Sequence, residues 1–190
     1  MISDDDLHAV LTESRRLGFL GPAEIADVVD HAGAYVRALA GVSGTVVDLG
    51  AGGGVPGLVV AAARADLHIV MIDRRSKRTD FLDRMVRRLG QESRLEVVNA
   101  DVRAHLGTRA GSYDAAMARG FADPVTTLTW GSRLVVAGGL VVISEPPDGD
   151  RWDPEILRTA GVVRRTSDRA VAVFQRSAPD GLVDGSDAPR

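Results

Sequence analysis

The stretch TVVDLGAGGGVPG, from Thr45 to Gly57, decides the fold of this chain. A β-branched run ends at the acidic Asp48, and glycines follow at alternate positions, Gly50, Gly52 and Gly54. Because glycine has no Cβ, this backbone can turn sharply and let a ligand approach closely, and the helix that follows presents free N–H groups. The stretch therefore predicts a strand, a ligand-binding loop and a helix, in that order.

Strand and helix patterns alternate on both sides of this glycine loop. We expect strands at Thr45–Leu49, His68–Asp73, Leu95–Asn99, Tyr113–Arg119 and Leu140–Ser144. We expect helices between them at Pro56–Arg64, Ser76–Leu89 and Pro124–Val135. This order predicts right-handed crossovers and a parallel sheet with helices on both faces, a three-layer α/β/α, Rossmann-like fold.

The two ends of the chain add to this core. Two amphipathic helices are expected before the first strand, one capped by Ser3 and stopped near Gly18, the other opened by Pro22. After Ser144 we expect a short helix at Trp152–Ala160. An antiparallel hairpin then brings the sheet to seven strands, through Val162–Arg165 and Ala170–Gln175. We predict one domain over residues 1–176, with 1–44 as a helical extension and 177–190 as a disordered tail.

Composition limits the classes of protein. The chain has 190 residues, 45% of them hydrophobic and 26% charged, as expected for one soluble globular domain. No apolar run approaches the roughly 18 residues that span a bilayer. The acidic start, Met1 to Asp6, does not resemble a secretory signal. With no cysteine there are no disulfides and no thiolate chemistry, and we expect a cytoplasmic monomer with no membrane contact.

Basic residues are concentrated in one segment although the net charge is −3. The members of this basic patch are Arg74, Arg75, Lys77, Arg78, Arg84, Arg87 and Arg88. Such a patch can attract a polyanion, with Arg74, Lys77, Arg78, Arg84 and Arg88 as candidate contacts to RNA phosphate. The alternative is a solvated helix face paired with Asp80 and Asp83, and both interpretations stay open.

A parallel sheet binds ligands beyond the carboxyl ends of its strands. Asp73 closes the second strand 23 residues after Gly50, where a carboxylate can accept hydrogen bonds from ribose hydroxyls or can cap the next helix. After the third strand, Asn99–Arg103 can read an adenine edge, and Arg119 closes the fourth strand. These positions indicate an adenosine-containing ligand.

Two cofactors fit these residues. Gly52–Gly57 satisfies G-x-G-x-x-G, the weak signature of a nicotinamide dinucleotide site. S-adenosylmethionine fits better, because Asp48 stands two residues before the first of the alternate glycines and a terminal hairpin suits a methyltransferase sheet. We therefore predict Asp48, Gly50, Gly52, Gly54, Asp73 and Asp101 as cofactor-site residues.

Four segments resemble one known family. They are DLGAGGGVPGL (Asp48–Leu58), DRRSKRTDFL (Asp73–Leu82), ARGFA (Ala118–Ala122) and the pair Gly138-Gly139. They are similar to the ribosomal RNA small subunit methyltransferase G family, of the glucose-inhibited division protein B type. The similarity runs from about Ala23 to Ser144.

The resemblance implies a class I methyltransferase fold and methylation of a guanine N7 in 16S ribosomal RNA. By matching position it implies cofactor contacts at Gly50, Val55, Val102, Arg103 and Arg119. Guanine N7 has a lone pair and no proton, so no general base is needed and positioning can suffice. Arg119 is our one candidate for positioning substrate or cofactor, and the histidine spacing predicts no metal site.

The chain departs from that family at its N-terminal helices and after the fifth strand. Glu145-Pro146-Pro147 stands where the family has a lysine. An acid at the substrate rim leaves open a small-molecule methyltransferase on the same fold, or a non-catalytic protein that binds cofactor or RNA. Trp130 and Trp152 are predicted to be packing residues.

Overall fold

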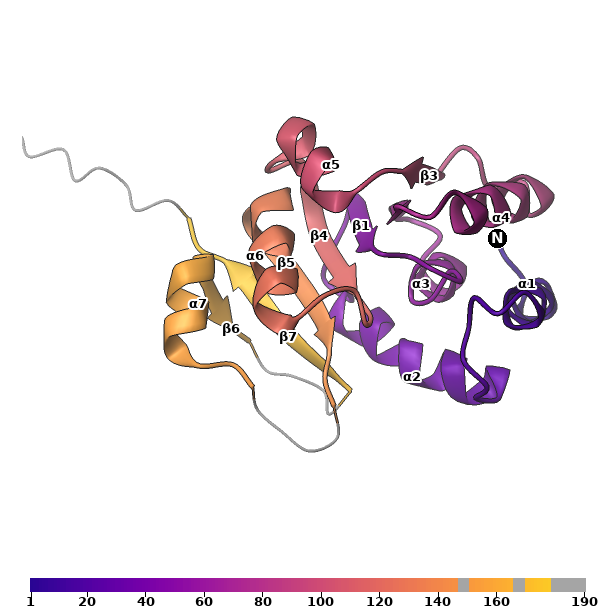
Figure 1. Cartoon of the computed structure of the whole chain (residues 1–190), viewed down its shortest axis with the longest axis horizontal. Coiled ribbons are helices and arrows are strands. Elements are labelled where there is room, and N and C mark those ends of the chain that lie inside the picture. Colours follow the sequence, from indigo (N-terminus) through magenta and orange to yellow (C-terminus); the bar gives the residue numbers. More distant parts are fainter. Residues whose placement is uncertain (147–150, 166–169, 179–190) are drawn as a thin grey trace, which may run out of the picture.

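The computed structural model describes residues 1–146, 151–165 and 170–178. From residue 179 on, the predicted tail lies outside the described residues. A seven-stranded sheet with the order β3-β2-β1-β4-β5-β7-β6 forms the centre of the molecule (Figure 1). The strands are β1 (Thr45–Leu49), β2 (His68–Asp73), β3 (Leu95–Asn99), β4 (Tyr113–Ala118), β5 (Val135–Ser144), β6 (Val162–Arg164) and β7 (Val171–Arg176).

Strands β1 to β5 pair in parallel, and β7 pairs antiparallel with both β5 and β6. The predicted α/β fold with a terminal antiparallel hairpin is therefore confirmed. The helices are α1 (Asp4–Arg16), α2 (Ile25–Ala38), α3 (Gly57–Ala63), α4 (Ser76–Arg88), α5 (Val102–Arg109), α6 (Pro124–Leu134) and α7 (Pro154–Ala160).

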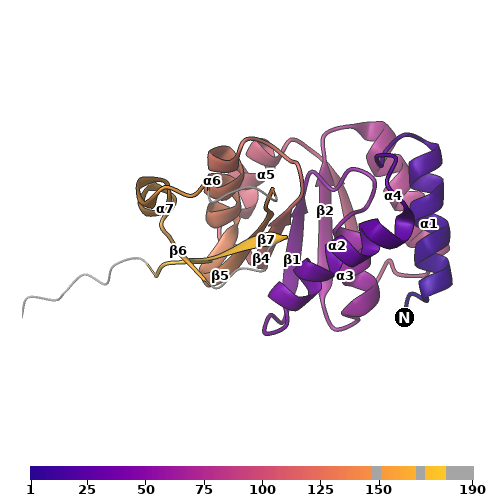
Figure 2. The same ribbon diagram turned by 90° about the horizontal axis from the view of Figure 1, so that it is seen from below.

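One hydrophobic cluster lies on each face of the sheet. Successive strand residues alternate between them: Val46 belongs to one cluster and Val47 to the other, as the two-residue period of a strand requires. The first cluster is completed by helices α1 to α4 and the second by α5 to α7. Helices thus cover both faces, and α1 and α7 lie at opposite ends of the molecule (Figure 2).

The N-terminal helices share the core of the sheet. Leu7, Val10 and Leu11 of α1 are buried in the same cluster as residues of α3 and β2. Ser3 caps α1 as predicted, because its side chain accepts a hydrogen bond from the Asp6 amide. The second helix begins at Ile25, so its predicted start at Pro22 is wrong. Arg15 of α1 donates to the Ala23 carbonyl and holds that segment outside the helix.

The sequence prediction missed one helix and shortened one strand. α5 was not predicted because it buries just Val102 and Leu106, which is a weak periodic signal. The strand expected at Leu140–Ser144 begins at Val135. Its pairing with β4 is interrupted, since Tyr113 pairs with Val135 and Ala115 pairs with Leu140. Gly138 and Gly139 lie in that irregularity, so the alternating pattern is lost there.

Replacing Leu11 with alanine tests whether α1 is part of one cooperative unit. Leu11 is fully buried, so we expect a single unfolding transition with a free energy of unfolding lower by about 2–4 kcal/mol. Denaturant titration followed by circular dichroism measures it. His8→Ala, at an exposed position of the same helix, should change stability by less than about 0.5 kcal/mol. Two separate transitions would contradict a shared core.

Candidate functional site

A cavity of about 430 Å³ opens at the carboxyl ends of β1, β2, β3 and β4. Strand β1 lies between β2 and β4, so the cavity is at the point where the strand order reverses, the usual ligand position in such sheets. Its lining residues are Gly50, Asp73, Arg74, Arg75, Arg78, Ala100, Asp101, Val102, Gly120, Phe121, Ala122 and Trp130. The structure therefore brings the ends of four strands and the start of α4 into one site.

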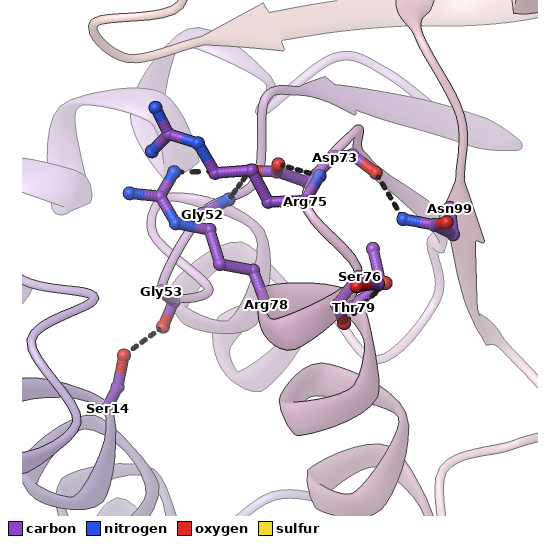
Figure 3. A network of polar contacts seen from close by, with 9 residues as sticks. All are labelled: Ser14, Gly52, Gly53, Asp73, Arg75, Ser76, Arg78, Thr79 and Asn99. Atoms are coloured by element: carbon purple, nitrogen blue, oxygen red, sulfur yellow. Dashed lines mark hydrogen bonds and ion pairs between the residues drawn. The ribbon is translucent and has the colours of Figure 1, made fainter.

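Hydrogen bonds from two directions hold the glycine loop (Figure 3). The Gly52 amide donates to Asp73 Oδ2 at 3.0 Å. Ser14 of α1 donates to the Gly53 carbonyl at 2.9 Å. Gly50 has φ +69°, and a Cβ there would lie 2.6 Å from the Phe121 ring, so neither the backbone nor the space admits another residue.

Asp73 organises the floor of the cavity. Its side chain is 5% exposed. Oδ1 accepts from the Arg75 amide at 2.9 Å, while Oδ2 accepts from Gly52 and from Arg78 Nη1 at 3.3 Å. The carboxylate receives the amide of the residue just before α4, and one of its roughly four acceptor positions stays unused, so both predicted roles are compatible. A ribose hydroxyl can therefore be accepted without breaking the loop.

Asp48 lies beneath the loop and does not line the cavity. Its Oδ2 accepts from the Gly57 amide at 2.9 Å, and among the described residues its buried Oδ1 has no hydrogen-bond partner. Burial raises the pKa of Asp48 to about 7, against the lowering effects of the Gly57 amide and Arg119. An unpaired buried oxygen indicates that this acid has a further electrostatic role.

The remaining predicted cofactor residues are divided between the cavity and its surroundings. Asp101 and Val102 line the cavity, and Asp101 caps α5 by accepting from the Arg103 amide at 2.8 Å. Arg103 is exposed and Val55 is buried, and neither is in the lining. Arg119 is half-buried, and its charge lowers the pKa of Asp48. It therefore lies near the buried end of the site.

The basic patch is also divided. Arg74, Arg75 and Arg78 line the cavity, but Lys77 does not. The pKa of Glu13 on α1 is lowered, first by its hydrogen bond to Arg16 and then by Arg16, Arg84 and Arg88. Arg84 and Arg88 thus lie near Glu13 of α1 and are not among the lining residues of the cavity. Arg87 pairs with Asp83 within α4, as the solvated-face alternative predicted.

Two aromatic residues of the site were missed as functional candidates. Phe121 and Trp130 both line the cavity, with ring centroids 5.9 Å apart and planes tilted by 57°. Trp130 does pack, but against a residue of the cavity wall. Phe121 belongs to the ARGFA segment that resembles the family, and this segment was the signal that could have identified it as a site residue. Trp152 is a packing residue as predicted, 5% exposed and edge-on to Phe174.

The negative charge of Glu145, the acid expected to alter the substrate rim, is compensated by neighbouring side chains. Its side chain is 7% exposed. Oε1 accepts from the Trp152 indole at 2.6 Å and lies 3.6 Å from Arg151 Nε. Glu145 therefore fastens the end of β5 to the segment before α7 and adds no free negative charge at the rim. Pro147 lies outside the described residues.

Solved structures identify the class of fold. The structure is similar to cofactor-bound Rv0187 from MTB, with a TM-score of 0.65, 20% identity and coverage of 93% of this chain and 92% of that chain. It is also similar to the [4+2]-cyclase SpnF, with a TM-score of 0.66, 17% identity and coverage of 92% and 94%. The fold is the class I methyltransferase fold. SpnF is a cyclase by name, so the fold alone leaves the reaction open.

Sequence comparison identifies the family. The family model of rRNA small subunit methyltransferase G matches residues 9–146, and the chain belongs to this family. A Salinispora arenicola member is 33% identical over 175 residues, which are 87% of this chain and 70% of that protein. One from Neisseria meningitidis is 36% identical over 95 residues. The chain spans about half the length of that relative, since the match covers 50% of this chain and 44% of the relative.

S-adenosylmethionine is the cofactor that this family and fold imply, and the residues present fit it. Asp73 keeps a free acceptor position at the cavity floor. A Cβ at Gly50 would reduce the space above the loop. Buried Asp48 has an oxygen, Oδ1, with no hydrogen-bond partner among the described residues, and the methionyl ammonium group supplies positive charge in addition to that of Arg119. Among the described residues, no group of three or more potential metal ligands is found, and no helix is long and apolar enough to cross a membrane.

Asp48→Asn tests the buried charge. The pKa of Asp48 rises from 3.8 to about 7 on folding, so wild-type stability falls as the pH rises from about 4 to about 7. At roughly 1.4 kcal/mol per pKa unit, ionised Asp48 lowers the free energy of unfolding by about 4 kcal/mol. A buried asparagine amide costs about 2 kcal/mol, so the substitution recovers about 2 kcal/mol. Thermal melts should show the ligand-free variant about 2 kcal/mol more stable at pH 8 and not more stable at pH 5. A pH-independent difference would contradict this.

Proposed function

We propose that this chain transfers the methyl group of S-adenosylmethionine to a guanine N7 in ribosomal RNA of the small subunit, as a cytoplasmic monomer. One observation carries the proposal: a single cavity joins Asp73, which holds the glycine loop, to the arginines of α4. The curated relatives named above are ribosomal RNA small subunit methyltransferases, which supports the choice of substrate.

The cofactor is held by residues from three strand ends. Asp73 accepts a ribose hydroxyl at its remaining acceptor position, and Ala100–Val102 contact the adenine. Gly50 and Gly52 give the methionyl part close access to the backbone. Val55 and Gly54 shape the loop from beneath, since a Cβ on Gly54 would lie 2.6 Å from Leu58. Three further residues contribute to the cofactor site through their charges: Asp48, Arg119 and the exposed Arg103.

The reaction depends on the positioning of base and methyl group more than on acid–base catalysis. When bound, the cofactor supplies an electrophilic methyl group on a sulfonium. Guanine N7 attacks with its lone pair and has no proton to lose, so the chain needs no general base. Arg74, Arg75 and Arg78 line the cavity, and their positive charge suits a nucleotide phosphate. The chain holds the guanine in line with the methyl group, which is worth several kcal/mol of the barrier.

The small-molecule alternative depended on Glu145, whose side chain is buried and hydrogen-bonded to Trp152. Glu145 therefore places no free negative charge against an RNA substrate. A non-catalytic binding protein remains distinguishable by experiment, since it would bind the cofactor without transferring its methyl group.

Asp73→Asn tests the cofactor site. The variant keeps the shape of the side chain and loses charge-assisted hydrogen bonds worth about 1.5–3 kcal/mol. Calorimetry should therefore show S-adenosylmethionine binding about 10–100-fold more weakly. Asp83→Asn, a carboxylate on α4 that pairs with Arg87 outside the cavity, is the matched control and should bind within about twofold of wild type. Absence of binding by the wild-type chain at millimolar cofactor would overturn the assignment.

A pair of double variants tests the divided basic patch. Arg74→Glu with Arg75→Glu changes the cavity wall, whereas Arg84→Glu with Arg88→Glu changes positions near Glu13 of α1. Methyl transfer to small ribosomal subunits should fall at least about tenfold for the first pair, with a shallower salt dependence, because two phosphate contacts are lost. The second pair should keep most of the activity. Equal losses would place the RNA along α1 and α4 instead.

A further inference from the structure

The cavity has an aromatic wall, whose residues also pack against the hydrophobic core beneath it. Every aromatic residue of the chain lies among the described residues. Six of them pack away from the cavity: Phe19, Tyr35, Phe81, Tyr113, Trp152 and Phe174. Phe121 and Trp130 are partly exposed and line it. One side of this aromatic pair packs on the core, and its partial exposure leaves ring surface available to a ligand in the cavity.

Backbone geometry directs this wall toward the glycine loop. Gly120, with φ +61°, turns the chain directly after β4. The Phe121 ring then lies against Gly50, 2.6 Å from where a Cβ would be. Trp130 on α6 supports it at 5.9 Å between ring centroids. The wall therefore borders the glycine loop at Gly50, where the proposed function places the methionyl part, whereas the side that it assigns to adenine is lined by Ala100–Val102.

The opposite side of the cavity is cationic, with Arg74, Arg75 and Arg78 at the start of α4. An aromatic surface and guanidinium groups around one cavity match the two parts of a nucleotide. The π-face of a base stacks on aromatic rings, and its phosphate pairs with arginine. Adenine already has its own contacts at the end of β3, so the aromatic wall is available for a second base.

We propose that Phe121 and Trp130 form the platform on which the target guanine stacks while its N7 faces the methyl group. This rests on the proposed function and adds the residues that select an unpaired purine. In the transfer, the N7 lone pair forms the new N–C bond as the S–C bond breaks. The electron pair stays on sulfur, and the positive charge passes to the guanine ring. Aromatic faces attract such a cation, so the platform stabilises the transition state more than the uncharged base.

Two measurements separate the platform from the cofactor site. Single-turnover methyl transfer to small ribosomal subunits, at saturating S-adenosylmethionine, should fall about tenfold or more in Phe121→Leu, as expected for a lost stacking contact of 1–3 kcal/mol. Calorimetric affinity for S-adenosylmethionine should stay within about threefold of wild type. Trp130→Phe, which keeps a ring, should retain most of the transfer rate. If Phe121→Leu weakens cofactor binding and leaves the saturated rate unchanged, the wall belongs to the cofactor and the proposal is wrong.

Tryptophan fluorescence tests the platform without turnover. Protein loaded with S-adenosylhomocysteine is titrated with 7-methylguanosine monophosphate, whose cationic base should quench Trp130 on stacking. The quench should disappear in Trp130→Phe, which retains Trp152 as an internal reference, and should weaken in Phe121→Leu. No quench in the wild type at millimolar nucleotide overturns the platform. A quench together with no methyl transfer to small subunits would refute the proposed function and leave the platform standing.

Discussion

The Asp73 carboxylate is the constraint on which the site depends. Its two oxygens receive the Gly52 amide of the loop and the Arg75 amide that precedes α4. One side chain at the end of β2 thus fixes the glycine loop against the start of α4, beside the arginines that line the cavity. Because backbone amides satisfy just part of its acceptor capacity, the same group can still meet a ligand. In the proposed function, the same buried charge both holds the loop and binds the ligand.

The N-terminal helices take part in this arrangement. Ser14 of α1 donates to the Gly53 carbonyl. The Leu20 side chain lies 2.7 Å from the position that a Cβ on Gly53 would take. Phe19 meets Phe81 of α4 edge-on at 5.6 Å. The segment before the first strand therefore covers the loop from the side opposite Asp73. A loop fixed on two sides needs little reordering to bind a ligand, which reduces the entropic cost of binding.

Three acids near the site are used in different ways because their surroundings differ. Asp73 is buried and well supplied with donors. Asp48 is buried with one oxygen unpaired, and its pKa is raised to about 7. Glu145 is buried beside Arg151 and Trp152 and fastens β5. Residue type alone does not separate these roles, since desolvation and the number of donors decide them.

The sequence by itself determined the order of strands and helices, the parallel sheet, the glycine loop and the positions of Asp48 and Asp73, because period, capping and glycine placement are local properties of the chain. The tertiary structure decided what those properties do not encode. It divided the basic patch between the cavity lining and positions near α1, and it paired Glu145 with Arg151. It also brought Phe121 to Gly50, which lies far away in sequence. The physical reason is that such contacts arise from the packing of separate elements, which leaves no periodic trace in either segment.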